Sequence, residues 1–516
     1  MTSETAAPLA RVPDRVASVD LGSNSFHMLI ARLVGGHLEI IDRLREPVRL
    51  AEGLTPDGAL GASVRERALA CLERFGQRLR TMPHGSVRVV GTNTLRRAHS
   101  AGDFLAAAEL ALGHPIEIVR GSEEARLIYL GSAHSIAHHD GRRLVVDIGG
   151  GSTECIVGEG FDVVKAHSLS MGCVHFTERY FPEGRVTNKA MKKAVLQAQL
   201  ELEPVRRGLA RTGWVRAYGA SGTIRAVDTA AHANGWCDGP LTAAGVDRLL
   251  KALVAARELD AVAIEGLKRD RLPVIAGGVA ILAALFDSLR IEGMELSPGA
   301  MREGVLYDLV GRIQHEDVRE RTIRAFQRRY HVDVAQASRV AATAQHLLEQ
   351  VRDAWGLDAE DAPRLLGWSA QLHEIGLAVS YSHYHRHGGY LVEHSDMPGF
   401  SRDEQRVLAG ILAGHRRKVV PEVFALIAPR LRPMAERLTV LLRLAVLVHR
   451  SRGGMAPRGL TLCAGKGREL ELAFPRSWWR DHPLARVDLE EQERHLRVLG
   501  VQLLVQNAGE DPVPAE

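Results

Sequence analysis

Two short segments carry the same pattern of small residues. Val19–Ser25 has the sequence VDLGSNS and Val146–Ser152 has the sequence VDIGGGS, each between two apolar stretches. The pattern predicts a strand, a tight turn and a second strand, and such a turn can direct several backbone N–H groups at one oxyanion. We therefore expect two facing turns to bind a phosphate group through Gly22, Ser23, Asn24, Ser25, Gly149, Gly150, Gly151 and Ser152. The alternative is that these turns only close two hairpins.

Carboxylates accompany both segments. Asp20 and Asp147 stand at matching positions just before each turn, and Glu154 follows the second turn. Mg²⁺ prefers oxygen ligands and commonly binds one or two carboxylates together with water and phosphate oxygens. The sequence therefore predicts that Asp20 and Asp147 can bind a hydrated Mg²⁺ ion.

A pair of adjacent glutamates, Glu123 and Glu124, opens a helix that follows a short strand, with Ser122 as its expected N-cap. Hydrolysis of a phosphoanhydride needs a group that orients and deprotonates water, and a carboxylate can do this. Helical neighbours point about 100° apart, so only one of the two is expected to face a cleft. The alternative is two solvated acids placed favourably for the helix dipole.

Arg96 lies at a similar junction between a strand and a helix, where a guanidinium can neutralise phosphoryl charge. The alternative is an ordinary surface arginine.

The repeated segments Val19–Ser25 and Val146–Ser152 also predict the domains that position these residues. Two similar hairpins predict two similar α/β lobes, residues 1–135 and 136–312. Apolar stretches that meet small-residue turns before a helix, at Ala217–Thr223 and Val274–Gly278, belong to the second lobe. Beyond a boundary near 310–318, long amphipathic helices predict a helical domain over 313–459, and strand-like alternation predicts a small α+β domain over 460–516.

Composition limits the class of protein. The chain has 516 residues, of which 46% are hydrophobic and 25% charged, as in soluble globular proteins. Its formal charge of +4 does not indicate a nucleic-acid partner. The longest apolar stretch, Pro273–Phe286, is shorter than the roughly 20 residues of a membrane span. The five cysteines lack any CxxC pair, and no secretory signal is recognisable, so we expect a cytoplasmic protein with reduced thiols.

Many ordered motifs together resemble one known family, the exopolyphosphatases and guanosine pentaphosphate phosphohydrolases. They are VDLGSNSFHMLIAR (19–32), GTNTLRRA (91–98), GSEEARLIYLG (121–131), VVDIGGGSTE (145–154), SMGCVHF (170–176), GASGTIRA (219–226), PGAMREGVLY (298–307), LHEIGL (372–377), HRHGGYLVEHSDMPGF (385–400) and HRRK (415–418). The resemblance implies a duplicated α/β N-terminal half of the actin, sugar-kinase and heat-shock ATPase fold. An all-α HD-like domain and a small α+β domain would follow.

The resemblance also assigns roles. It implies Mg²⁺ near Asp147 and Glu154, and Glu124 as the catalytic base, with relatives that are homodimers. We expect processive release of orthophosphate from inorganic polyphosphate, because the GGGSTE and GTNTLR motifs resemble the polyphosphate-degrading branch more closely. The alternative substrate is guanosine pentaphosphate, hydrolysed by the same residues. A non-catalytic sensor of a phosphorylated ligand is the alternative from another class.

A basic segment between about residues 375 and 468 could retain a long polyanion, or bind anionic lipid peripherally at the inner membrane face. The residues expected to line it are His383, His385, Arg386, His387, Arg416, Arg417 and Lys418. The alternative is a solvated basic face or a subunit contact. His373–Glu374 stands where HD-type enzymes carry a metal-binding His-Asp pair, and we expect a site without metal. His27 is expected to pack or to support the site, and guanosine tetraphosphate is a possible further ligand.

Overall fold

The chain divides into two compact units, Met1–Val318 and Arg319–Glu516. In the computed structural model the described residues are 13–34, 37–55, 57–98, 101–136, 141–313, 317–357, 361–452, 456–457, 459–465 and 468–507. The last residues of the predicted α+β domain, 508–516, therefore lie outside the described residues. Each unit is considered by itself below.

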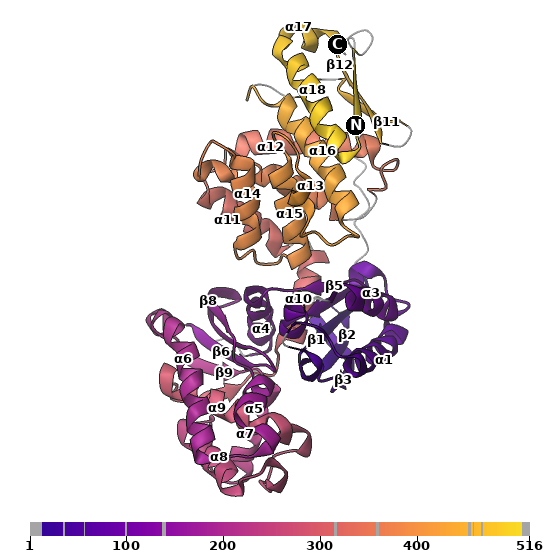
Figure 1. The fold of residues 1–516 in the computed structure, drawn as a ribbon. Coiled ribbons are helices and arrows are strands. Elements are labelled where there is room, and N and C mark those ends of the chain that lie inside the picture. Colours follow the sequence, from indigo (N-terminus) through magenta and orange to yellow (C-terminus); the bar gives the residue numbers. More distant parts are fainter. Residues whose placement is uncertain are drawn as a thin grey trace. The chain divides into compact units, whose positions relative to one another are not determined.

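The first unit contains two five-stranded sheets with the same connectivity (Figure 1). In lobe I the order is β3-β2-β1-β4-β5, and in lobe II the equivalent order is β8-β7-β6-β9-β10. The first three strands of each lobe pair antiparallel, and the last two extend the sheet in parallel. The repeated sequence pattern thus corresponds to a repeated topology.

The strands of lobe I are β1 (Arg15–Leu21), β2 (Phe26–Val34), β3 (His37–Glu46), β4 (Val87–Gly91) and β5 (Ile116–Ile118). Its helices are α1 (Ala62–Leu79), α2 (Asn93–Arg97), α3 (Ala101–Leu112) and α4 (Gly121–Ser135), joined by α10 (Met301–Ile313) from later in the chain. The strands of lobe II are β6 (Arg143–Ile148), β7 (Thr153–Glu159), β8 (Asp162–Leu169), β9 (Arg216–Gly219) and β10 (Met294–Leu296). Its helices are α5 (Cys173–Tyr180), α6 (Asn188–Thr212), α7 (Gly222–Ala233), α8 (Ala243–Ala256) and α9 (Leu272–Leu289).

Helices α4 and α10 pack against each other and fill the space between the two sheets. Their backbones touch, since a Cβ on Gly131 would lie 1.9 Å from the Ala300 carbonyl oxygen and one on Gly304 would lie 1.8 Å from that of Leu127. Only glycine allows such an approach. The middle of α4 is therefore held closely against α10 between the lobes.

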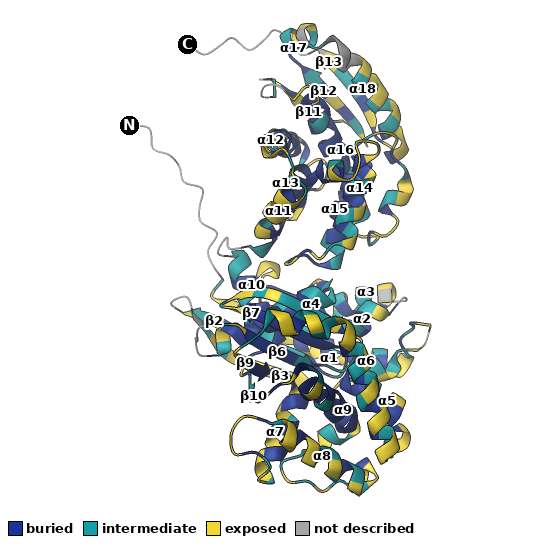
Figure 2. Cartoon of the chain, turned by 90° about the vertical axis from the view of Figure 1, so that its left-hand side faces the viewer, coloured by how far each residue is buried: buried dark blue, intermediate teal, exposed yellow. Residues whose placement is uncertain are grey.

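Helix α9 differs from its sequence-based interpretation. The stretch Val274–Gly278, expected as a strand and turn, lies inside the helix. With the preceding turn, Arg269–Leu289 is the one helical segment among the described residues that is long and apolar enough to cross a membrane. However, 78% of its apolar window is buried inside lobe II, where Figure 2 shows it in dark blue. It is a core helix, and its apolar length reflects packing on both sides.

The second unit begins with helices that surround one core: α11 (Val318–Arg329), α12 (Val334–Val351), α13 (Asp361–Leu372), α14 (Tyr384–His394), α15 (Arg402–Gly414) and α16 (Arg432–Val448). A three-stranded sheet follows, made of β11 (Thr461–Ala464), β12 (Glu469–Phe474) and β13 (Gln502–Asn507), with α17 (Arg476–Asp481) and α18 (Pro483–Leu496). Leu462, Leu472 and Phe474 belong to the same hydrophobic cluster as the helices. The two predicted C-terminal domains therefore share a single core.

Candidate active site

The two hairpins have matching registers. Asp20 pairs with His27 across β1 and β2, and Asp147 pairs with Glu154 across β6 and β7. The residues between the paired strands are the small-residue turns, so the predicted strand–turn–strand arrangement is present twice. The aspartates occupy equivalent positions, whereas the facing residue is a histidine in lobe I and a glutamate in lobe II.

A cavity of about 450 Å³ lies between the lobes, and both turns line it. The predicted residues that it brings together are Asp20, Gly22, Ser23, Asn24, Ser25, Glu124, Asp147, Gly149, Gly150, Gly151, Ser152 and Glu154. The two turns also approach each other closely. A Cβ on Gly150 would lie 3.0 Å from Ser23 Cβ, and one on Gly151 would lie 2.7 Å from Asn93 Oδ1. A side chain at either glycine would therefore have to displace a neighbouring side chain where the lobes meet.

Nearby cations neutralise only part of the negative charge of the carboxylates in this cavity. Burial raises the pKa of Asp20 to about 7 and that of Asp147 to about 7, and Arg302 offsets only part of this effect. Burial and the neighbouring Glu124 and Asp147 also raise the pKa of Glu154 well above its ordinary value. One buried oxygen, Asp20 Oδ1, has no hydrogen-bond partner among the described residues. Such a group of carboxylates is suited to a bound cation.

Mg²⁺ fits this donor set. Its preferred ligands are oxygens, and it typically takes one or two carboxylates and keeps several waters. Asp147, Glu154 and Asp20 supply carboxylate oxygens, and the unpartnered oxygen of Asp20 is what a missing cation would leave. Across the described ranges, no three His, Cys, Asp or Glu residues are grouped closely enough to enclose an ion on their own.

The first turn of α4 separates the roles of the two adjacent glutamates. Both are buried, with exposed fractions of 2% for Glu123 and 7% for Glu124, so the alternative of two solvated acids is wrong. Glu124 lines the cavity. Burial raises the pKa of Glu124, and Arg96 partly offsets this effect. Helix α4 begins at Gly121 after Arg120, so Ser122 is not its N-cap as predicted.

Glu123 faces the other way, into a buried ionic cluster. Arg126 donates to it from Nε at 2.7 Å and from Nη2 at 2.8 Å, and Arg126 also pairs with Asp308 on α10. Arg88 on β4 donates to Asp308 at 2.6 Å. Burial opposes ionisation of Asp308, but Arg126, Arg88 and Arg312 outweigh it and hold the pKa of Asp308 well below its ordinary value. This compensated cluster fixes the turn that presents Glu124.

Arg96 contacts Glu124 directly. Its Nη1 donates to Glu124 Oε2 at 2.9 Å and to the Val119 carbonyl at 2.8 Å. Its side chain does not line the cavity. Arg96 therefore contacts the candidate base directly, and its expected role at the phosphoryl oxygens stays a prediction.

Sequence reasoning missed Arg302, which lines the cavity at the start of α10. Its Nη1 donates to His27 Nδ1 at 3.0 Å. Burial, with Arg302, Arg45 and Arg271 nearby, lowers the pKa of His27 to about 3, so this imidazole is neutral and can accept the hydrogen bond. The available signal was the PGAMREG motif together with the equivalence of His27 and Glu154 in the repeat.

The predicted basic residues of the second unit gather around two neighbouring loops. Arg386, Arg417 and Lys418 are exposed, and Arg416 stacks over the ring of Tyr384 with its Cζ 4.8 Å from the centroid. His383 is exposed and His387 is half-buried, whereas His385 is buried and cannot line the surface as expected. These residues belong to another unit than the cavity between the lobes.

The His373–Glu374 pair is occupied by protein contacts. His373 Nδ1 is hydrogen-bonded to the Ala370 carbonyl at 2.7 Å, and Glu374 forms an ion pair with Arg452. Arg452 thus contacts one oxygen of this carboxylate, and the expectation of a site without metal stays a prediction.

Comparison with known proteins gives two family matches. Residues 29–313 match the model described as the Ppx/GppA phosphatase family, and residues 318–493 match that of Ppx/GppA phosphatase, domain III. Curated relatives from Vibrio cholerae and Pseudoalteromonas translucida are 40% and 39% identical over 494 and 491 residues. Each alignment covers 95% of this chain and 98% of the relative, and both relatives are named guanosine-5'-triphosphate,3'-diphosphate pyrophosphatase.

A solved exopolyphosphatase from Cytophaga hutchinsonii has the same fold as the first unit. It is 22% identical, with a TM-score of 0.53, and the match covers 58% of this chain and 98% of that one. Together with the doubled strand order, this match agrees with the expected duplicated α/β N-terminal half, whereas its relation to the actin-like fold stays a prediction.

Proposed function

Because the chain belongs to the Ppx/GppA phosphatase family and is a hydrolase of phosphoric anhydride bonds, we propose that it removes the terminal 5′-phosphate of guanosine pentaphosphate. The observation that carries the choice of substrate is the near-complete alignment with relatives named for that nucleotide. The sequence-based preference for polyphosphate rested on small motif differences. These weigh less than about 40% identity along the whole chain.

In this proposal the two turns bind the terminal phosphate from both sides through backbone N–H groups. Glu124 accepts a proton from a water molecule as its oxygen attacks phosphorus, and the bond to the bridging oxygen breaks on the opposite side. Orthophosphate and guanosine tetraphosphate leave. Arg302, which lines the same cavity, balances negative charge on the transferred group.

The protonation of Glu124 decides whether it can serve as the base. Burial raises the pKa of its carboxyl group above that of a solvated glutamate, while Arg96 at 2.9 Å offsets part of this rise. A general base is most effective when its pKa approaches the working pH. Asp147, Glu154 and Asp20 would hold Mg²⁺, which supplies charge neutralisation at the phosphate oxygens.

The decisive experiment compares substrates. Orthophosphate release is measured with Mg²⁺ from guanosine pentaphosphate and from long-chain polyphosphate, with nucleotide products separated by ion-exchange chromatography. The Glu124→Gln variant measures the background of each assay. We expect the higher kcat/KM for the nucleotide, with guanosine tetraphosphate as the product. A higher kcat/KM for polyphosphate, or release of pyrophosphate, would overturn the proposal.

A further inference from the structure

The turn of lobe I is held from behind by a short helical segment, η1 (Leu50–Gly53). The N–H of Arg49, the residue before η1, donates to the Asn24 carbonyl at 2.8 Å. The N–H of Ala51 donates to the Ser23 carbonyl at 3.0 Å. These two hydrogen bonds fix the direction of two peptide groups of the turn.

The direction of these peptide groups decides where the N–H groups of the turn point. In a trans peptide, the carbonyl of one residue and the N–H of the next point in opposite directions. Because the Ser23 and Asn24 carbonyls point to η1, the N–H groups of Asn24 and Ser25 point away from it, and both residues line the catalytic cavity. Neither of these N–H groups, nor the buried Ser25 hydroxyl, is hydrogen-bonded to a described residue. All three donors are thus available to an oxyanion.

The turn of lobe II is held in a similar way by the first residues of α5. The N–H of Cys173 donates to the Gly149 carbonyl at 2.9 Å, and the N–H of Val174 donates to the Gly150 carbonyl at 3.0 Å. The two backbones are in close contact, because a Cβ on Gly172 would collide with the Gly150 carbonyl. Helix α5 needs no strained residue for this, since its N-cap Gly172 has an extended backbone.

Lobe I achieves the same arrangement with a strained residue, Arg49, whose backbone is left-handed at φ 52° and ψ 51°. Residues other than glycine rarely adopt this conformation, and β-branched residues are the least suited to it. The neighbours enforce it, because Val48 and Leu50 are buried in the core of lobe I and Arg67 donates to the Val48 carbonyl at 2.7 Å. The Arg49 side chain pairs with Glu52 and does not line the catalytic cavity. The backbone of Arg49, and not its charge, therefore contacts the turn.

We propose that Arg49 is a positioning residue, whose left-handed backbone keeps the N–H groups of Asn24 and Ser25 directed at the terminal phosphate. It acts through the hydrogen bond to the Asn24 carbonyl. The inference rests on the proposed binding of phosphate by the turns, and it holds whichever phosphoanhydride the enzyme hydrolyses. The alternative is that the conformation of Arg49 only connects β3 to α1, and then it affects stability without affecting phosphate binding.

The test replaces Arg49 by residues that differ in their tolerance of the left-handed conformation. Orthophosphate is the probe, and its Kd for the full chain with Mg²⁺ is measured by titration calorimetry. KM and kcat are measured with whichever of the two phosphoanhydrides the parent hydrolyses faster. We expect Arg49→Val to raise Kd and KM about tenfold with a smaller change in kcat, because fewer molecules hold the turn in its binding conformation. Arg49→Asn and Arg49→Gly, which tolerate the conformation, should stay within about twofold of the parent.

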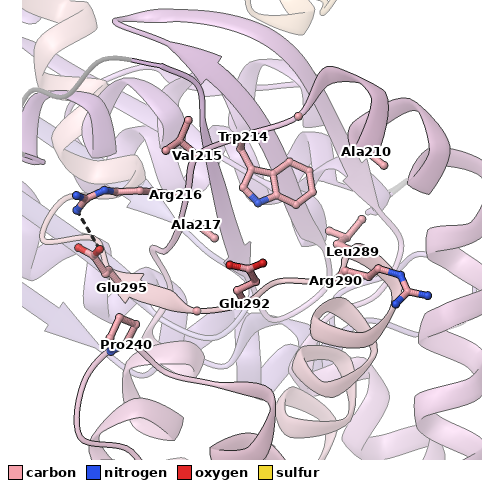
Figure 3. Close-up of a pocket in the computed structure, with 12 residues that line it drawn as sticks. Ala210, Trp214, Val215, Arg216, Ala217, Pro240, Leu289, Arg290, Glu292 and Glu295 are labelled. Carbon is pink, nitrogen blue, oxygen red and sulfur yellow. Dashed lines mark hydrogen bonds and ion pairs between the residues drawn. The ribbon is translucent and has the colours of Figure 1, made fainter.

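Arg290→Val is the matched control for strain. Arg290 ends α9 in the same conformation, at φ 53° and ψ 48°, and lines a separate cavity of lobe II (Figure 3). Like Arg49→Val, it should lower the melting temperature, but its Kd and KM should equal those of the parent. Thermal melting also verifies that each variant is folded at the temperature of the assays.

A parental Kd in Arg49→Val would overturn the inference. So would equal losses in the Val, Asn and Gly variants, because the arginine side chain would then be what matters. A raised Kd in Arg290→Val would overturn it as well, since a general loss of stability would then explain the effect. If the parent itself showed no saturable binding of orthophosphate, the proposed role of the turns would fail, and this inference with it.

Discussion

The two hairpins share a backbone and differ in charge. In lobe I, Asp20 faces the neutral His27, which accepts a hydrogen bond from Arg302. In lobe II, Asp147 faces Glu154, which accepts a hydrogen bond from Ser168 at 2.8 Å. Duplication thus preserved the turn that can bind phosphate, while one exchanged position gave lobe I an arginine and lobe II a second carboxylate.

This difference assigns different chemistry to the two sides of one phosphate. The carboxylate pair of lobe II is suited to a cation, and the arginine held in lobe I is suited to phosphate oxygens directly. Glu124 lines the same cavity, and its charge raises the pKa of Asp20, Asp147 and Glu154. The two turns have the same backbone but different charges, so the substrate would bind between them in one orientation only.

The largest effect on kcat is expected from substitution of Glu124, which lines the cavity together with both hairpin turns. In Glu124→Gln, kcat should fall about 10²–10⁴-fold, because the amide cannot accept the proton from water. Binding of guanosine tetraphosphate should remain. The neighbouring substitution Glu123→Gln is the matched control for position, since Glu123 is turned toward Arg126 and does not line the cavity. Glu123→Gln should lower the melting temperature. Its kcat, measured at a temperature where the variant is folded, should change much less than that of Glu124→Gln. Parental kcat in Glu124→Gln would refute the assignment.

The next effect separates the two hairpin aspartates. If lobe II is the cation side, Mg²⁺ should raise the free energy of unfolding of the parent by about 2.7 kcal/mol at a concentration of 100 Kd. We expect Asp147→Asn to abolish this increase and Asp20→Asn to reduce it only in part. Thermal denaturation with and without EDTA measures both. An equal loss in the two variants would show that the hairpins contribute alike.

The folding stability of the protein without Mg²⁺ should decrease as pH rises. The pKa of about 7 for Asp20 and Asp147 lies above the unfolded value, so between pH 4 and 7 the folded chain retains protons that the unfolded chain has released. Stability should therefore fall as pH rises through this window, by about 1.4 kcal/mol per pH unit for each carboxyl group. Chemical denaturation in EDTA from pH 5 to 7.5 measures this, and a rise in stability would contradict the raised pKa values. Mg²⁺ should remove most of the dependence.

The sequence predicted the parts of the site that depend on local pattern. Two like-spaced Gly/Ser/Asn turns indicated the hairpins, and the paired glutamates indicated α4. Residues that act through distant contacts were missed. Arg302 reaches His27 across 275 positions, and Glu123 is distinguished from Glu124 only by Arg88, Arg126 and the distant Asp308. The buried helix α9 was misjudged because a helix packed on both sides has no amphipathic period to reveal it.

The smallest effect is expected from substitution of His27. It tests whether the function of Arg302 depends on its hydrogen bond to His27. Loss of the acceptor in His27→Ala should free the Arg302 side chain and lower kcat/KM about tenfold, as expected for a hydrogen bond to a charged group. A glutamine can accept the same bond, so His27→Gln should recover most of the loss. Because the pKa of His27 is about 3, the imidazole stays neutral from pH 5 to 9, and the acidic limb of the rate profile should be the same in the parent and in His27→Gln. A shifted limb would mean that His27 titrates during turnover.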